Sequence, residues 1–217
     1  MATSTEPAPR QRYARGEGDK LRLDLLHAAA ELMATHGTLD GISLRAVARE
    51  AGVSPTAVYR HFDDHLALLR ESVAQCWANF YRAMRDARDS SDDPFVAFRA
   101  TGEAYVRFAM MQPGQYRVLF SNTIDLDMSR EEIHSLIDAP DDVTDSGMAT
   151  FEILVDLVAD MLSELHDDRD PFFVAVQVFT WIHGIVDLCG THPDTPWPEV
   201  PDLLDGLRAA LRLTPPA

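Results

Sequence analysis

The sequence predicts an all-α protein in which an N-terminal three-helix domain with a helix-turn-helix is joined by a long helix to a second α-helical domain. Apolar residues recur at three- and four-residue spacing along most of the chain after residue 20, which indicates amphipathic helices. No segment reads as a strand. Residues 43–62, SLRAVAREAGVSPTAVYRHF, are typical of two short helices separated by a glycine turn.

The first helix of this unit has recognisable ends. Ser43 is a good N-cap residue, and Gly52 is expected to end the helix because glycine accepts the left-handed conformation of a C-cap. Val53 is expected to fill the turn as a buried side chain. The inward apolar face of the helix is formed by Leu44, Val47 and Ala48.

The second helix is very short. It restarts at Ser54-Pro55, where serine can cap and proline fits the first helical position. Val58 and Phe62 are four residues apart and are expected to pack inward. The outward-facing residues are Thr56, Ala57, Tyr59, Arg60 and His61, whose donors suit phosphates and base edges. A helix this short is not stable alone, and the pattern also fits an ordinary helical hairpin.

Helical segments flank this unit on both sides. The upstream helix ends at Gly37, and the downstream helix runs for about 25 residues with apolar positions from Leu66 to Met84. Together, residues from about Lys20 to Trp77 resemble the DNA-binding domain of the tetracycline-repressor (TetR) family. The resemblance is carried by Leu25, Ala28-Ala29, Leu32, Gly37, Ser43, Val47-Ala48, Ala51-Gly52-Val53-Ser54, Tyr59, His61-Phe62 and Leu66.

The resemblance implies three parts: a disordered N-terminal arm over 1–19, a helix-turn-helix domain over 20–77, and a ligand-binding and dimerisation domain over 78–217. It implies that the helix Ser54–Phe62 reads the major groove of a pseudo-palindromic operator. The candidate DNA-binding residues are Ser43, Arg45, Ser54, Pro55, Thr56, Ala57, Tyr59, Arg60, His61 and His65. His65 stands where the family usually has a phosphate-gripping lysine, so DNA binding is expected to weaken as pH rises through the histidine range.

The charge is divided unevenly along the chain. The net charge is −16, yet residues 1–62 hold 8 Lys and Arg against 7 Asp and Glu, a net of +1, while the remainder carries −17. Such a division suits a regulator that approaches DNA with one end, although the acidity could equally serve solubility or a salt-adapted host. Arg10, Arg12 and Arg15 could let the arm reach phosphates or the adjacent minor groove.

The rest of the chain reads as further helices. They are expected over 94–111, over a short segment within 115–121, over 148–166, over 171–189 and over 199–213. Residues 122–147 hold 8 acidic residues and few apolar anchors, so they are expected to form a connection, with one short helix near 129–137. Asp167-Asp168-Arg169-Asp170 is expected to be a turn between helices followed by an N-cap.

By analogy with the family, the second domain is expected to surround an apolar cavity for a small-molecule effector. The candidate lining residues are Tyr105, Phe108, Met111, Tyr116, Phe120, Phe151, Phe173, Phe179 and Trp181. Helices 148–166 and 171–189 are the expected homodimer interface, because a helix apolar on most sides needs burial on most sides. Trp181, His183 and Gly184 resemble a Trp-x-His-Gly motif of one TetR subgroup.

Other functions are less well supported by the residues. No catalytic motif stands at a suitable strand–helix junction, and no cofactor or metal site is predicted. Cys76 and Cys189 lie far apart in the sequence and lack the spacing of metal ligands. We therefore expect them to be small buried side chains in a cytoplasmic protein. Polar residues interrupt the apolar run 171–189, so membrane insertion is not expected. A dimeric α-helical binding protein without DNA function and a Mg-dependent all-α enzyme remain as alternatives.

Overall fold

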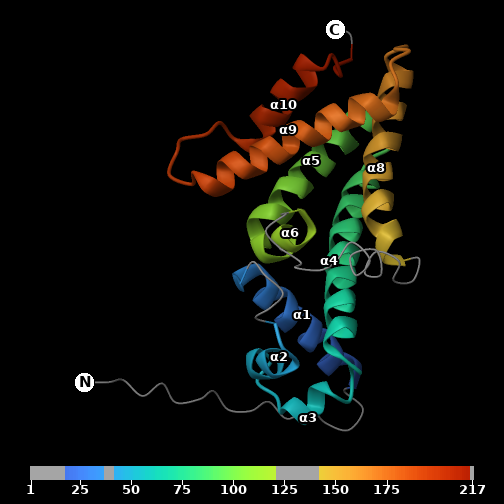
Figure 1. The fold of residues 1–217 in the computed structure, drawn as a ribbon. Helices are drawn as coiled ribbons and strands as arrows, with labels where there is room; N and C mark the ends of the chain where they lie inside the picture. Colours follow the sequence, from blue (N-terminus) through green and yellow to red (C-terminus); the bar gives the residue numbers. More distant parts are fainter. Residues whose placement is uncertain (1–17, 37–41, 121–141, 216–217) are drawn as a thin grey trace. The chain divides into compact units, whose positions relative to one another are not determined.

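The computed structural model describes residues 18–36, 42–120 and 142–215, and these residues form helices and turns without a strand (Figure 1). The predicted all-α fold is therefore confirmed. The helices are α1 (Gly18–His36), α2 (Leu44–Glu50), α3 (Pro55–Val58), α4 (His65–Arg88), α5 (Pro94–Met111), α6 (Pro113–Phe120), α8 (Asp142–Glu164), α9 (Pro171–Thr191) and α10 (Val200–Ala210).

The chain divides into two compact units, and the division falls inside α4, after Cys76. The first unit holds α1, α2, α3, the beginning of α4 and, from Gly114 onward, α6. Its core is one cluster of buried apolar side chains, the largest of which include Leu25, Met33, Ile42, Phe62 and Leu68. Burial raises the pKa of the Cys76 thiol in this core to about 12, so the thiol stays protonated at neutral pH.

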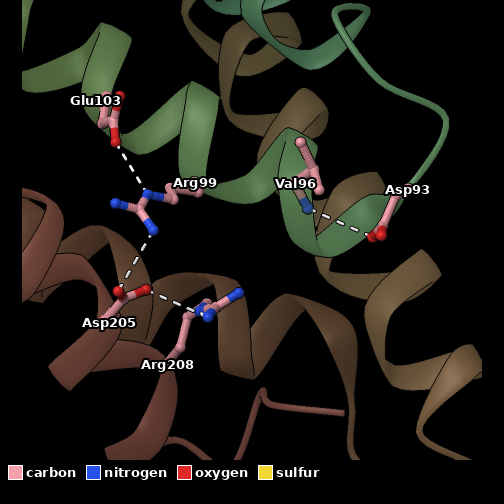
Figure 2. Close-up of polar contacts among 6 residues, drawn as sticks. All are labelled: Asp93, Val96, Arg99, Glu103, Asp205 and Arg208. Carbon is pink, nitrogen blue, oxygen red and sulfur yellow. Dashed lines mark hydrogen bonds and ion pairs between the residues drawn. The ribbon is translucent and has the colours of Figure 1, made fainter.

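The second unit holds the remainder of α4 together with α5, α8, α9 and α10. In this unit α9 packs against α5, α8 and α10 (Figure 1). Gly102 lies where α5 approaches α10 closely: a Cβ there would lie 2.9 Å from a methyl carbon of the buried Leu204, whose side chain would have to shift. At the edge of this contact Arg99 bonds to both Glu103 and Asp205, and Arg208 also pairs with Asp205 (Figure 2).

Predicted helix starts are confirmed where a capping residue precedes a proline. The Asp93 carboxylate accepts hydrogen bonds from the backbone N–H groups of Phe95 (2.8 Å) and Val96, and Figure 2 shows the bond to Val96. The Asp170 carboxylate likewise accepts from the N–H of Phe172 at 3.0 Å. In both helices proline occupies the first turn, where a missing N–H costs no hydrogen bond.

Several helix bounds differ from the predictions. The first helix begins at Gly18, inside the segment assigned to the arm, and α8 begins at Asp142, six residues before the predicted position 148. Residues 142–147, DVTDSG, hold a single apolar side chain, so no hydrophobic periodicity marks this first part of α8. The break before α6 is one residue, Gln112, and the helix already includes Pro113 and Gly114.

The ends of α8 and α10 also differ from the predicted positions 166 and 213. Helix α8 stops at Glu164, and α10 stops at Ala210 although apolar residues continue to Leu213. In each case a residue with positive φ follows, His166 at 53° and Arg212 at 55°, which turns the chain out of the helix. The rest of the predicted arm, Gly37, the connection up to residue 141 and the possible helix near 129–137 lie outside the described residues.

Candidate nucleic-acid interface

The turn between α2 and α3 is held by backbone hydrogen bonds. At the start of α2 the N–H of Ala46 donates to the Ser43 hydroxyl at 3.1 Å, so the predicted N-cap is confirmed. At the other end Gly52 has φ 67°, and the N–H of Val53 donates to the Ala48 carbonyl at 2.9 Å. This arrangement is a Schellman motif, which requires the left-handed conformation at Gly52. The direction of the chain into α3 is therefore fixed by the backbone.

Helix α3 is a single turn that depends on the core beneath it. Pro55 occupies its first turn and Ser54 precedes it with an extended backbone, although the Ser54 hydroxyl makes no capping hydrogen bond. Val58 and Phe62 are buried, as predicted, and the N–H groups of His61 and Phe62 both donate to the Val58 carbonyl. Two buried side chains thus anchor a helix that cannot be stable in isolation.

The remaining side chains around α3 are accessible. Tyr59 is 55% exposed, and Ala57 and His61 are half-buried. The exposed members of the candidate set are Ser43, Arg45, Ser54, Pro55, Thr56, Tyr59 and Arg60. Hydroxyl, phenol and guanidinium groups are therefore presented at α3 and at the start of α2, where a groove of DNA could meet them. Their contacts with DNA stay a prediction.

The surroundings of His65 differ from those of the other candidates. His65 is the first residue of α4, and the Asp64 carboxylate caps this helix by accepting from the N–H of Ala67 at 2.7 Å. The Nε2 atom of His65 is buried and has no hydrogen-bond partner. A phosphate therefore cannot reach Nε2 in this conformation. The helix break between His61 and His65, which the sequence predicts, is confirmed.

One residue that supports this region, Arg22, is not predicted from the sequence. Arg22 of α1 donates to the main-chain carbonyl of His61 at 2.6 Å, forms an ion pair with Glu71 of α4, and places its guanidinium 4.6 Å from the centre of the Phe62 ring. The two ionic partners are 49 positions apart. No periodicity or short motif could have paired them.

The aromatic residues predicted to line a cavity are only partly brought together. In the second unit Tyr105, Phe108, Phe151 and Phe179 lie in one network of edge-to-face rings that also contains Phe80. Within it the Tyr105 hydroxyl and His183 Nε2 are hydrogen-bonded at 2.7 Å. Burial lowers the pKa of His183 below its ordinary value, so the imidazole is neutral at neutral pH.

The other five predicted lining residues lie elsewhere. Tyr116 and Phe120 of α6 belong to the first unit, where their rings pack together. Met111, Phe173 and Trp181 are 75%, 63% and 45% exposed. A polar pocket of about 420 Å³ is found instead beside the turn between α8 and α9. It is lined by Asp167, Arg169, Gln177, Ala210, Leu211 and Arg212.

Helix α9 carries apolar side chains on two sides, and the chain itself buries only one of them. One face is buried in the second unit through Val174, Ala175, Val178, Ile182 and Val186. The opposite side leaves large apolar side chains in solvent: Phe172, Phe173, Val176, Trp181 and Leu188. Its length and composition would also permit a membrane span, which is weak evidence for one helix of this kind. An exposed apolar face of this kind is typical of interaction surfaces.

The acidic cluster between α8 and α9 has a structural role. Asp170 caps α9, and a hydrogen bond from the Arg169 side chain lowers the pKa of Asp167 below its ordinary value. The prediction of a turn followed by an N-cap is therefore confirmed. Among residues 18–36, 42–120 and 142–215, no group of three or more His, Cys, Asp or Glu side chains could hold a metal ion.

An all-α chain that presents a capped helix-turn-helix in a separate unit has the architecture of a DNA-binding regulator. Comparison with known families agrees. Residues 25–71 match the family described as bacterial regulatory proteins, tetR family, and residues 98–204 match the tetracyclin repressor-like C-terminal domain. The chain belongs to the TetR family of transcription regulators. The C-terminal match includes Trp181, His183 and Gly184.

One curated relative matches this chain over part of its length. An uncharacterised helix-turn-helix transcriptional regulator of Haemophilus influenzae is 32% identical over 101 residues, which is 46% of this chain and 49% of the relative. The alignment thus spans about half the length of that curated relative.

Two solved structures share the fold over most of the chain. A protein of unknown function from Rhodococcus sp. RHA1 has a TM-score of 0.70 and 26% identity, with 93% of this chain and 96% of that chain covered. A TetR family transcription regulator from Marinobacter aquaeolei VT8 has a TM-score of 0.67 and 17% identity, with 91% and 98% covered.

Proposed function

We propose that this chain is a cytoplasmic, homodimeric transcription regulator that binds a pseudo-palindromic DNA operator and is released from it by a small apolar effector. The observation that carries the proposal is the two-sided character of α3. Val58 and Phe62 are buried on one side, while Thr56, Tyr59 and Arg60 stand in solvent on the other. A helix anchored in this way can enter a major groove without losing its own support.

Charge supports docking by one end of the chain. The net charge of +1 over residues 1–62 contrasts with −17 over the rest. DNA phosphates therefore repel most of the chain but not the nearly neutral segment that contains the helix-turn-helix. Gly18, the first residue of α1, lies in the same region, because a Cβ there would lie 3.7 Å from the His61 ring.

Selection from a random duplex library, followed by fluorescence anisotropy, tests DNA binding. Tyr59→Ala is expected to weaken binding to the selected duplex by about tenfold or more, as loss of a base contact does. Arg60→Ala is expected to lower the salt dependence by about one charge, as loss of a phosphate contact does. Arg107→Ala is the matched control, because Arg107 is exposed on α5 of the other unit. A protein that prefers no duplex over random competitor contradicts the proposal.

The proposed dimer forms through α8 and α9. Its support is the apolar side of α9, and two-fold symmetry would place two α3 helices in half-sites about 34 Å apart. Sedimentation velocity tests it with Phe173→Asp, which is expected to yield monomers. Leu23→Asp, at an exposed leucine of α1, is the control and should leave the dimer intact. A wild-type chain that sediments as a monomer at every concentration excludes this interface.

The proposed effector site is the aromatic network around Tyr105 and His183. The rings of this network are apolar, and the hydrogen-bonded pair offers one polar group, so an apolar ligand with a single hydrogen-bonding group would suit this chemistry. Thermal-shift screening with apolar and cationic compounds, followed by displacement from the selected duplex, tests it. A compound that stabilises the wild type but equally stabilises Phe179→Ala binds elsewhere.

A dimeric binding protein without DNA function is the second candidate, favoured by the buried Nε2 of His65, which removes one expected phosphate contact. The duplex selection separates the two functions. A dimer that binds an effector and ignores every duplex would establish the second. The family is one of regulators, and enzymatic activity is not part of the proposal.

A further inference from the structure

The carbonyl groups of α3 are bonded by the turn that follows it, because the N–H groups of Tyr59, Arg60 and His61 donate to Pro55, Ala57 and Val58. The helix is four residues long and is followed by an irregular turn, so the carbonyl groups beyond Val58 have no helical N–H partner. No glycine or asparagine follows it: the sequence after α3 is Tyr59-Arg60-His61-Phe62. Another part of the protein must therefore satisfy these groups or leave them to water.

Arg22 supplies a partner for this turn from a different helix. Its Nη1 donates to the His61 carbonyl at 2.6 Å, which places a cation against the turn that follows α3. The same guanidinium lies over the ring of Phe62, the buried anchor of the turn. One planar group thus contacts two consecutive residues of the segment that carries the outward-facing side chains.

The third contact of Arg22 fixes the guanidinium itself. Its Nη2 forms an ion pair with Glu71, one and a half turns into α4. Both side chains are more than a third exposed, so the pair adds little stability of its own. It does orient the guanidinium fork, and a lysine could not satisfy the carbonyl and the carboxylate in the same planar geometry.

We infer that Arg22 is a positioning residue that holds the turn after the DNA-reading helix from α1 and links it to α4 through Glu71. This inference rests on the proposed DNA-binding function. Arg22 sets which way Tyr59 and Arg60 point, and it does not itself touch a phosphate. Its loss therefore lowers the preference for the selected sequence while leaving the attraction to any duplex unchanged.

The experiment measures two affinities and one salt slope for the full chain. The variants are Arg22→Met, Arg22→Lys and Glu71→Gln, with Arg107→Met in the other unit as the control for charge. Anisotropy with the selected duplex and with random duplex gives the ratio of specific to non-specific affinity. Arg22→Met is expected to lower this ratio by about tenfold, the scale of a lost hydrogen bond from a charged donor, with the salt slope of wild type. Arg22→Lys is expected to restore part of the ratio.

Amide hydrogen exchange provides a readout that needs no DNA. In Arg22→Met the amides of Arg60, His61 and Phe62 are expected to exchange faster, while those of α2 keep their wild-type rates. Unchanged exchange at these three amides, or an unchanged affinity ratio with intact wild-type binding, overturns the positioning role. A salt slope reduced by about one charge also overturns it, since Arg22 would then contact phosphate directly.

The two measurements distinguish failure of the proposed DNA-binding function from failure of the positioning role. A wild-type chain without duplex preference refutes DNA binding, and the exchange rates still decide whether Arg22 holds the turn after α3.

Discussion

Replacing Gly52 by alanine isolates the backbone strain at the turn between α2 and α3. Gly52 has φ 67°, and a Cβ built there meets no heavy atom within 4 Å. The substitution therefore creates no clash, and its cost is the left-handed conformation itself, about 1–2 kcal/mol for a residue with a Cβ. Alanine also restricts the unfolded chain, which returns about 0.4–1 kcal/mol. The expected net loss is about 1 kcal/mol of the free energy of unfolding.

Gly206→Ala is the matched control for this prediction. Gly206 lies inside α10, and a Cβ there also meets no heavy atom within 4 Å. The same chemical change should stabilise the protein by about 0.5–1 kcal/mol, because glycine is costly within a helix. The two variants thus differ in the sign of their effect.

Urea denaturation followed by circular dichroism measures both variants. With a slope of about 1–3 kcal/mol per molar urea, the midpoint of Gly52→Ala should fall by about 0.3–1 M, and that of Gly206→Ala should rise. A midpoint for Gly52→Ala equal to or above that of wild type would refute the reasoning, because the turn would then accept a side chain without strain.

Three further predictions concern single contacts. Ser43→Ala removes the cap of α2 and should cost about 1 kcal/mol in urea denaturation, whereas Ser43→Asp should retain most of the stability; equal losses would contradict the capping role. Gly102→Ala should give a lower melting temperature than Gly206→Ala, because a methyl group forced against Leu204 offsets the gain of alanine within a helix, and Leu204→Ala in the same chain should remove this difference. Because burial lowers the pKa of His183 in the folded chain, the His183 imidazole of the unfolded chain binds a proton at a higher pH, beginning near its ordinary pKa of about 6.5. Stability should therefore decline from pH 7 to 5, and a His183→Gln variant that declines as steeply excludes His183 as the cause.

The helix-turn-helix was predictable because its determinants are local. The cap at Ser43, the positive φ of Gly52 and the proline of α3 each follow from one residue and its immediate neighbours. Burial of Val58 and Phe62 follows from their spacing of four. The same reasoning placed Asp170 at the start of α9.

Predictions that required a specific neighbour were less complete. Apolar composition could not separate Phe179, which lies in the aromatic network, from Phe173, which stands in solvent on the same helix. The polar beginning of α8 has no hydrophobic periodicity, so its first six residues were assigned to a connection. The burial of His65 Nε2 likewise depends on how α4 packs, which its position in the sequence does not reveal.

The sequence alone determined that this chain is helical, where its helices begin beside capping residues, and that one pair of them forms a helix-turn-helix of the TetR family. These features depend on dihedral preferences and on hydrogen bonds between residues a few positions apart. Only the tertiary structure decided that Arg22 holds the turn after α3 and that one side of α9 remains uncovered. Those features depend on which surfaces meet when distant segments pack, and periodicity records only that a face is apolar, not what covers it.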